Sequence, residues 1–373
     1  MSRNFDIRRI VVKVGSSCLV SGMKLDKNKM KKLVGEIADL KDEGKEVILV
    51  TSGAIAAGSS ILNLKLRPIP MPLQQASAAI GQGILMHEYK ELFNERGYDV
   101  AQLLLTQESF SQRERYLNVG NTLSMLLKRG IIPIVNENDA IAIDELDHGK
   151  TGCFDDNDKL SALVAGKMGA GLLIMLSDVD GLYSDNPRRE RNVELISLVE
   201  NVDEVRDMAK KRGNSMGKGG MEGKIDAADI AARFGIPVVI ANSEKANVLM
   251  DIIDGKEVGT LFLARGAMSH KKRWISFSTS IKGSLVIDEG AKIAITEKGA
   301  RLLPAGISYV LGTFSKGDVI NIVYDDRVIA RGLTNYSSEE LDSIKGVKTH
   351  EIEGILGRHA YKEVINRDNM VML

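Results

Sequence analysis

Two lysines beside glycines are the residues of this 373-residue sequence whose surroundings most suggest chemistry on a phosphate. Lys13 lies near the end of the apolar run RRIVVKVG (8–15), which closes with Gly15 and is followed by two serines. Lys224 ends KGGMEGK (218–224) and falls in the first turn of a predicted helix, where a cation opposes the helix dipole. A bound phosphate would remove that conflict, and glycine-rich loops offer it free backbone N–H groups. Without a phosphate, Lys13 would simply be a lysine beside a tight turn, and Lys224 would be a solvated lysine after a glycine loop.

A cluster of acids could supply the countercharge. Residues 155–158 hold three carboxylates at the predicted start of a helix. Asp156 or Asn157 could cap that helix, but three neighbouring carboxylates repel one another unless cations lie nearby. Those cations could be Mg²⁺ or the lysines Lys13 and Lys224. A solvated acidic cap would explain one of the carboxylates better than all three.

Small and polar residues follow three further predicted strands. Ser52 and Gly53 end EVILVTSG, the segment NEND (136–139) follows IIPIV, and Ser177 and Asp178 follow GLLIML. Small residues let a ligand approach the backbone, although close packing of a helix on a sheet also selects them. Four polar residues at 136–139 exceed what a turn needs, which favours a binding site. A surface loop and a ligand loop explain Ser177 and Asp178 equally well.

The sequence lacks the motifs of P-loop proteins, dinucleotide-binding proteins, disulfide-rich proteins and zinc proteins. Gly219 and Ile225 follow the two glycine-lysine pairs where a P-loop requires Ser or Thr. The triplet at 81–83, GQG, lacks the third glycine of a dinucleotide fingerprint. The two cysteines, Cys18 and Cys153, are too few for a disulfide framework, and no Cys/His cluster has zinc-ligand spacing.

The overall composition narrows the partners and the compartment. Fifty basic and fifty acidic residues give no net charge, so a general attraction to nucleic acid or anionic lipid gains no support. The chain start has no apolar signal core, and no apolar run reaches about 18 residues. We therefore expect a cytoplasmic protein without a membrane segment.

The elements that must position these residues are short apolar strands alternating with helices. Strands are predicted at 8–15, 46–53, 100–106, 131–137, 171–178 and 236–241. Helices are predicted at 26–43, 115–129, 157–168 and 222–234. This alternation predicts an α/β fold with a mainly parallel open sheet sandwiched by helices. Ligands of such sheets bind beyond the carboxyl ends of the strands, where the polar residues above are found.

The sequence changes character near residue 263. Residues 264–274 are polar and basic like a linker, and short strands separated by turns follow, which predicts a small β-barrel. We therefore divide the chain into a domain at 1–262, a linker at 263–273 and a second domain at 274–373.

Six motifs in register resemble the amino acid kinase family: VVKVGSS, VILVTSGAIAAG, PIVNENDAIA, DDNDKLSALVA, LSDVDGLY and GKGGMEGKIDAADIA. The resemblance covers residues 8–262, and the tail from Trp274 resembles a PUA domain. Within the family, the motifs are most similar to members that phosphorylate the γ-carboxylate of L-glutamate. The resemblance implies ATP and Mg²⁺ as cofactors and L-glutamyl 5-phosphate as product, in the first step of proline biosynthesis.

The resemblance also implies a role for each matched residue. Lys13 and Lys224 would neutralise the transferring phosphoryl group, and Asp158 would hold both lysines. No general base is required, since the γ-carboxylate is ionised at pH 7. Glutamate would be bound by Ser52, Gly53, Asn136, Asp139, Asp156 and Asn157. The nucleotide would be bound by Lys13, Gly15, Ser177, Asp178, Lys218, Gly219, Gly220, Met221 and Lys224. The metal ligands are unknown.

Several points stay open. The link at 140–155 looks longer than is usual in the family, so its register and any contact of Lys150 with substrate are undetermined. The resemblance implies feedback inhibition by proline and a homo-oligomer of two or four chains. The alternatives are a family member acting on a different carboxylate or phosphate acceptor, and a PUA-containing RNA-binding regulator. Residues 274–373 carry 12 Lys plus Arg and 13 Asp plus Glu, so nucleic acid is not the expected partner.

Overall fold

The computed structural model describes most of the chain as two compact units. The described residues are 3, 7–22, 24–64, 70–106, 108–141, 156–185, 193–211, 221–266, 270–277, 281–357 and 361–372. The first unit comprises Met1–Thr106 and Asn118–Met268, and the second comprises Gln107–Leu117 and Ser269–Leu373. Residues 107–117 thus group with the C-terminal part of the chain.

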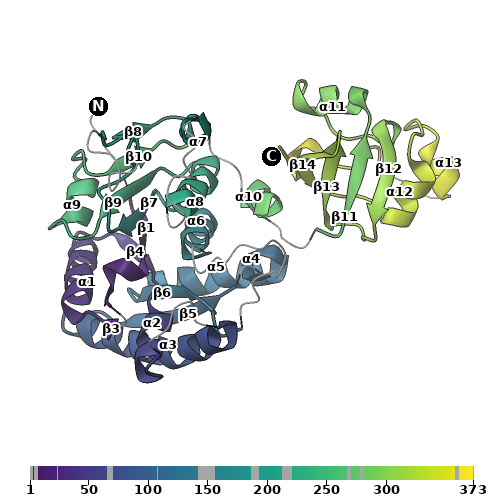
Figure 1. The fold of residues 1–373 in the computed structure, drawn as a ribbon. Coiled ribbons are helices and arrows are strands. Elements are labelled where there is room, and N and C mark those ends of the chain that lie inside the picture. Colours follow the sequence, from purple (N-terminus) through teal and green to yellow (C-terminus); the bar gives the residue numbers. More distant parts are fainter. Residues whose placement is uncertain are drawn as a thin grey trace. The chain divides into compact units, whose positions relative to one another are not determined.

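The first unit is built on an eight-stranded sheet in the order β5-β6-β4-β1-β7-β9-β10-β8 (Figure 1). Its strands are β1 (Arg9–Val14), β4 (Glu46–Val50), β5 (Val100–Leu105), β6 (Ile132–Glu137), β7 (Leu172–Ser177), β8 (Leu198–Val199), β9 (Val238–Asn242) and β10 (Thr260–Phe262). All neighbours pair in parallel except β9 and β10. The predicted mainly parallel sheet is confirmed. A two-stranded ribbon, β2 (Val20–Ser21) and β3 (Lys24–Leu25), follows β1.

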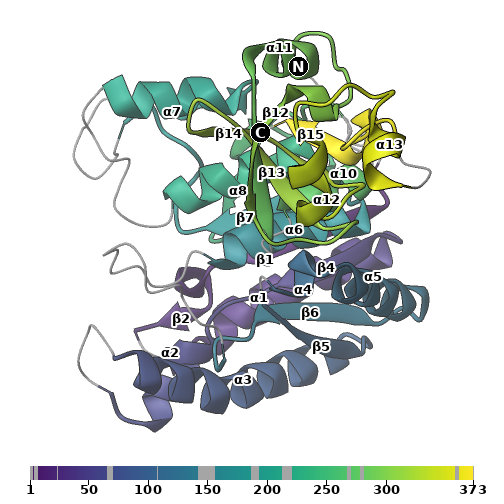
Figure 2. The ribbon, with the colours of Figure 1, turned by 90° about the vertical axis from the view of Figure 1, so that its right-hand side faces the viewer.

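Helices cover both faces of this sheet (Figures 1 and 2). One face packs against α1 (Lys27–Asp42), α2 (Ala54–Ile61), α3 (Met71–Asn94) and α9 (Val248–Ile253), whose buried side chains share one core with the strands. The other face carries α6 (Asp156–Met168) and α8 (Met221–Arg233), and α5 (Arg113–Lys128) and α7 (Val202–Lys211) complete the helices of this part. Because strand side chains alternate, each strand sends every second residue to each helical layer.

The predicted helices begin and end close to where the sequence placed them. The helix predicted at 26–43 is α1, and Asp26 caps it by accepting hydrogen bonds from the backbone N–H groups of Asn28 and Lys29. The longest helix, α3, was not predicted. It lies against α2 through glycines: a Cβ at Gly81 would fall 1.8 Å from the carbonyl oxygen of Ala54. Close backbone packing of this kind leaves no clear apolar stripe to read in the sequence.

The second unit contains a five-stranded sheet in the order β12-β11-β13-β14-β15. Its strands are β11 (Gly283–Ile287), β12 (Ile307–Gly312), β13 (Val319–Tyr324), β14 (Arg327–Leu333) and β15 (Met370–Met372). Its helices are α4 (Glu108–Ser111), α10 (His270–Phe277), α11 (Glu289–Thr296), α12 (Ser338–Ile344) and α13 (Ile352–Leu356). It has its own core, which includes the fully buried Tyr336. The separate β-rich C-terminal domain that the sequence predicted is confirmed.

Candidate active site

A buried carboxylate joins the two lysines that the sequence singled out. Lys13 Nζ lies 2.5 Å from Asp158 Oδ1, and Lys224 Nζ lies 3.0 Å from Asp158 Oδ2. Asp158 is fully buried, and the lysines are only 4% and 7% exposed. The structure therefore brings together three residues that are far apart in the sequence and come from β1, α6 and α8.

The local structure explains why these charges are tolerated. Asp158 lies in the first turn of α6, where the helix dipole stabilises a carboxylate. Lys224 lies in the first turn of α8, where the dipole is unfavourable to a cation, as the sequence indicated. The sequence offered two compensating anions, a phosphate and the acids at 155–158, and the structure places the Asp158 carboxylate beside Lys224. The three side chains nevertheless sum to one positive charge, which suits an anionic ligand.

Asn157 connects two further strand ends at the same edge of the sheet. Its Nδ2 donates to Ser52 Oγ at 3.3 Å, and its Oδ1 accepts from the backbone N–H of Glu137 at 3.3 Å. Ser52 follows β4, and Glu137 ends β6. Gly53 comes next and caps α2 with a φ of 101°, a left-handed conformation that favours glycine. The two hydrogen bonds of Asn157 thus join the ends of β4 and β6, next to the start of α2.

The other predicted site residues fall at element ends. Gly15 follows β1 and precedes the short 3₁₀ turn η1 (Ser16–Cys18), and Asp139 lies in the turn after β6. Asp156 is the first residue of α6, and Met221 is the first residue of α8. The predictions for Lys218, Gly219 and Gly220, and those for the link that includes Lys150, lie outside the described residues.

Two predicted nucleotide residues lie at the end of β7, which Ser177 ends and Asp178 follows. Ser177 is buried and its hydroxyl donates to Asp178 at 3.3 Å. Asp180, two residues on, accepts a hydrogen bond from Asn242 at 3.0 Å and pairs with Lys245 at 3.1 Å. The hydrogen bond from Asn242 lowers the pKa of Asp180, and Lys245 lowers it further. This loop therefore carries a carboxylate that stays ionised at neutral pH.

One buried contact involves a residue that the sequence did not single out for the site. Asn136 donates from Nδ2 to Gln82 Oε1 at 2.8 Å, between β6 and α3. In the sequence, Gln82 drew notice only as the middle residue of GQG (81–83), which lacks the third glycine of a dinucleotide fingerprint. A lone glutamine among small residues carries no signal of its own, so only the fold could have found it.

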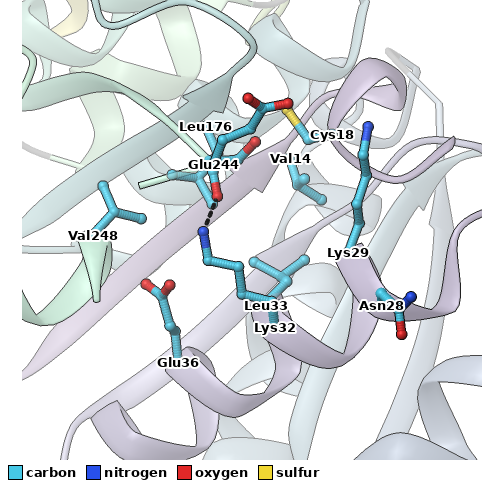
Figure 3. Close-up of a pocket in the computed structure, with 11 residues that line it drawn as sticks. Val14, Cys18, Asn28, Lys29, Lys32, Leu33, Glu36, Leu176, Glu244 and Val248 are labelled. Carbon is cyan, nitrogen blue, oxygen red and sulfur yellow. Dashed lines mark hydrogen bonds between the residues drawn. The ribbon is translucent and has the colours of Figure 1, made fainter. Parts of the chain in front are cut away.

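A pocket of about 280 Å³ lies on the opposite face of the sheet, against α1 and α9 (Figure 3). Val14 and Leu176 line its apolar part, and Lys32 and Glu36 are among its charged residues. Lys32 Nζ donates to two backbone carbonyls, at 2.7 and 2.8 Å, and Glu36 accepts from a backbone N–H of α9 at 2.9 Å. These charges tie structural elements together.

Comparisons with known proteins identify the families of the two domains. The sequence model of the amino acid kinase family matches residues 8–242, and the chain belongs to that family. The PUA domain model matches residues 283–356. Relatives named glutamate 5-kinase are similar over nearly the whole chain. That of Thermoanaerobacter sp. (strain X514) is 49% identical over 369 residues, covering 98% of both chains. That of Methanosarcina barkeri is 44% identical over 375 residues, covering 98% of this chain and 96% of the relative.

Among solved structures, the UMP kinase from Ureaplasma parvum matches with a TM-score of 0.47 and 14% identity, covering 69% of this chain and 99% of the other. Within the described residues, no helix combines the length and apolar character that a membrane crossing requires. The family resemblance of the kinase motifs and of the PUA tail is confirmed by the family models.

Proposed function

We propose that this protein transfers the γ-phosphoryl group of ATP to the γ-carboxylate of L-glutamate, giving L-glutamyl 5-phosphate. This is the reaction of a glutamate 5-kinase and the first step of proline biosynthesis. The full-length similarity to relatives of that name supports the choice of substrate. The observation that carries the chemistry is the single buried carboxylate of Asp158 between the ammonium groups of Lys13 and Lys224.

The two lysines supply positive charge where the phosphoryl group is transferred. Phosphoryl transfer depends on positioning and on neutralising charge spread over the phosphoryl oxygens. Asp158 fixes both ammonium groups before the substrate arrives, so little reorganisation is needed in the transition state. The γ-carboxylate of glutamate is the nucleophile and is already ionised at pH 7, so the site needs no general base.

Glutamate binds at the ends of β4 and β6. The Ser52–Asn157 hydrogen bond places polar groups of both residues there, beside the first N–H groups of α2. Asn136 and Asp139 come from the end of β6 and the turn after it. Gly53 and Asp156 complete the residues assigned to glutamate. A helix start of this kind also suits a substrate carboxylate.

ATP binds at Gly15, Ser177, Asp178 and Met221, together with the two lysines and residues 218–220. ATP enters as its Mg²⁺ complex, so the ion is part of the substrate. No group of three His, Cys, Asp or Glu side chains within the described residues could hold a metal, and we assign the ion no protein ligand.

Four further predictions remain. Feedback inhibition by proline and assembly into two or four copies rest on the family resemblance. The cytoplasmic location rests on the absence of signal-like and membrane-spanning apolar runs, and the division at 1–262, 263–273 and 274–373 rests on the change in sequence character.

An acyl-phosphate trap tests the function. The protein is incubated with ATP, Mg²⁺ and hydroxylamine, and the hydroxamate formed is measured with L-glutamate, L-aspartate or N-acetyl-L-glutamate. We expect ATP-dependent hydroxamate with L-glutamate alone. Hydroxamate from another acid, with none from glutamate, would assign the chain to a different reaction of the family. No hydroxamate from any acid, with salt-sensitive binding of a structured RNA by the full chain, would favour a regulator.

A further inference from the structure

Two buried side-chain amides near the proposed glutamate site are only half satisfied. Asn136 is 1% exposed and Gln82 is 9% exposed, and one hydrogen bond joins Asn136 Nδ2 to Gln82 Oε1. Gln82 Nε2 and Asn136 Oδ1 have no hydrogen-bond partner within the part of the chain that the structure describes. One donor group and one acceptor are therefore left over on this bonded pair of side chains.

An arrangement like this is unfavourable for a purely structural contact. Buried polar atoms in folded proteins nearly always have partners, because they lose their bonds to water. Rotating both amides by 180° does not solve the problem, since it exchanges the bonded atoms and again leaves a donor and an acceptor. On the same helix, the hydroxyl of Tyr89 pairs with that of Thr51 at 2.7 Å. The helix α3 can thus satisfy a buried polar group where no ligand is needed.

The two amides lie beside the elements assigned to glutamate. Asn136 directly precedes Glu137, whose backbone N–H donates to Asn157, and Asn157 in turn donates to Ser52. Gln82 follows Gly81, which packs against the first residue of α2. The pair therefore sits between the start of α2 and the end of β6.

We propose that Gln82 and Asn136 recognise the α-amino acid end of glutamate, an inference that rests on the proposed function. Asn136 Oδ1 accepts a hydrogen bond from the α-ammonium group, and Gln82 Nε2 donates one to the α-carboxylate. One unbonded acceptor and one unbonded donor on two contacting side chains match an amino acid head group, which carries a cation and an anion on one carbon. The γ-carboxylate is left to face the lysines. Gln82 is thus a specificity-determining residue.

Gln82→Met tests this proposal, because methionine keeps the length of the side chain and removes its amide. We expect the KM for L-glutamate to rise on the order of tenfold, while the KM for ATP is unchanged. 4-Aminobutyrate, which is glutamate without its α-carboxylate, serves as a competitive inhibitor. Its inhibition constant should change less than twofold, since it lacks the group that Gln82 contacts. Tyr89→Phe, the control on the same helix, should lower the melting temperature and leave both constants unchanged.

Other outcomes separate the two proposals. Wild-type protein that makes no glutamyl hydroxamate would refute the function itself. If the wild-type protein is active and the KM for glutamate is unchanged in Gln82→Met, the role of Gln82 is refuted while the proposed function stands. The role of Gln82 is also refuted if the KM for glutamate and the inhibition constant of 4-aminobutyrate rise by equal factors. If Gln82→Met does not fold, Gln82→Glu keeps an acceptor for Asn136 and should weaken glutamate more than 4-aminobutyrate, because its charge repels the α-carboxylate.

Discussion

The two faces of the sheet at the end of β1 both bury charged side chains, but they neutralise them differently. Lys13 points to the face covered by α6 and α8, where it shares the carboxylate of Asp158 with Lys224. Its neighbour Val14 lines the pocket on the other face. In that pocket, the charges of Lys32 and Glu36 are satisfied by backbone groups.

We read this difference as support for a phosphate site on the face of Lys13. Lys32 donates to the carbonyls of Ser243 and Lys245, so the peptide dipoles of the loop after β9 already stabilise its charge. Glu36 accepts from the N–H of Leu249 and so caps α9. On the other face, Lys13 and Lys224 share the single carboxylate of Asp158, and the remaining net positive charge favours a phosphate.

Replacing Asp158 should produce the largest effect. In Asp158→Asn, two buried ammonium groups lose the anion between them, so we expect the free energy of unfolding to fall by about 3–5 kcal/mol. We also expect kcat to fall at least about 100-fold, because the lysines are no longer held. Urea unfolding and the hydroxamate assay measure the two effects. A stable variant would mean that Asp158 does not hold the lysines in the free protein.

Replacing Lys224 should separate activity from stability. Lys224→Met leaves Lys13 and Asp158 as a neutral pair, so the free energy of unfolding should stay within about 1 kcal/mol of wild type. The kcat should fall about 100-fold or more, since one of two charges on the phosphoryl group is lost.

Lys32→Met on the pocket face is the matched control for Lys224→Met. It leaves two carbonyls without their ammonium partner, so it should destabilise by about 1 kcal/mol and keep kcat. Near-normal kcat in Lys224→Met would remove Lys224 from the mechanism, and a large loss of kcat in Lys32→Met would abolish the contrast between the faces.

An intermediate effect is expected at Asn157. Asn157→Ala removes the bonds to Ser52 and to the backbone of Glu137, so the KM for glutamate should rise on the order of tenfold. The KM for ATP should change less. Asn28→Ala, which alters an asparagine lining the pocket, should change neither constant. Equal rises in both KM values would show that Asn157 supports the site as a whole and not glutamate in particular.

Much of this fold could be predicted from local patterns, and much of the site could not. The apolar runs identified β1, β4, β6, β7 and β9, because strands buried on both faces are continuously apolar, and they also identified the apolar but partly exposed edge strand β5. The short strands β8 and β10 carry too few residues to show a pattern. The helix α3 was missed because its contacts with α2 use small residues, as at Gly81.

The site depends on which strands become neighbours. The residues suggested Lys13 and Lys224 as cations near the acids at 155–158, and only the family resemblance predicted that Asp158 holds both. In the structure, β1 lies beside β7 and α6 packs on α8, which brings the three residues together. The Gln82–Asn136 contact likewise joins a helix to a strand far away in the sequence. No local sequence pattern predicts this contact, because its significance depends on two side-chain atoms that have no hydrogen-bond partner in the described residues.

The smallest effect is expected at Glu36, and it depends on pH. Burial raises the pKa of Glu36, although the N–H of Leu249 and the charge of Lys32 oppose that rise. The folded protein therefore binds a proton more tightly there than the unfolded chain does, whose Glu pKa is about 4.3. Stability from this group is present below that pH and is lost as pH rises through the folded pKa.

Glu36→Gln should remove this pH dependence while its amide oxygen still accepts from Leu249. The variant should therefore gain stability relative to wild type as pH rises from about 4 toward neutrality, with no change in kcat. Urea unfolding at a series of pH values, for both proteins, measures the difference. A variant that loses stability at neutral pH would show that the Glu36 charge is needed, as the charge of Asp158 is. The contrast between the pocket and the Lys13–Asp158–Lys224 site would then rest on the two lysines and the anion that they bind.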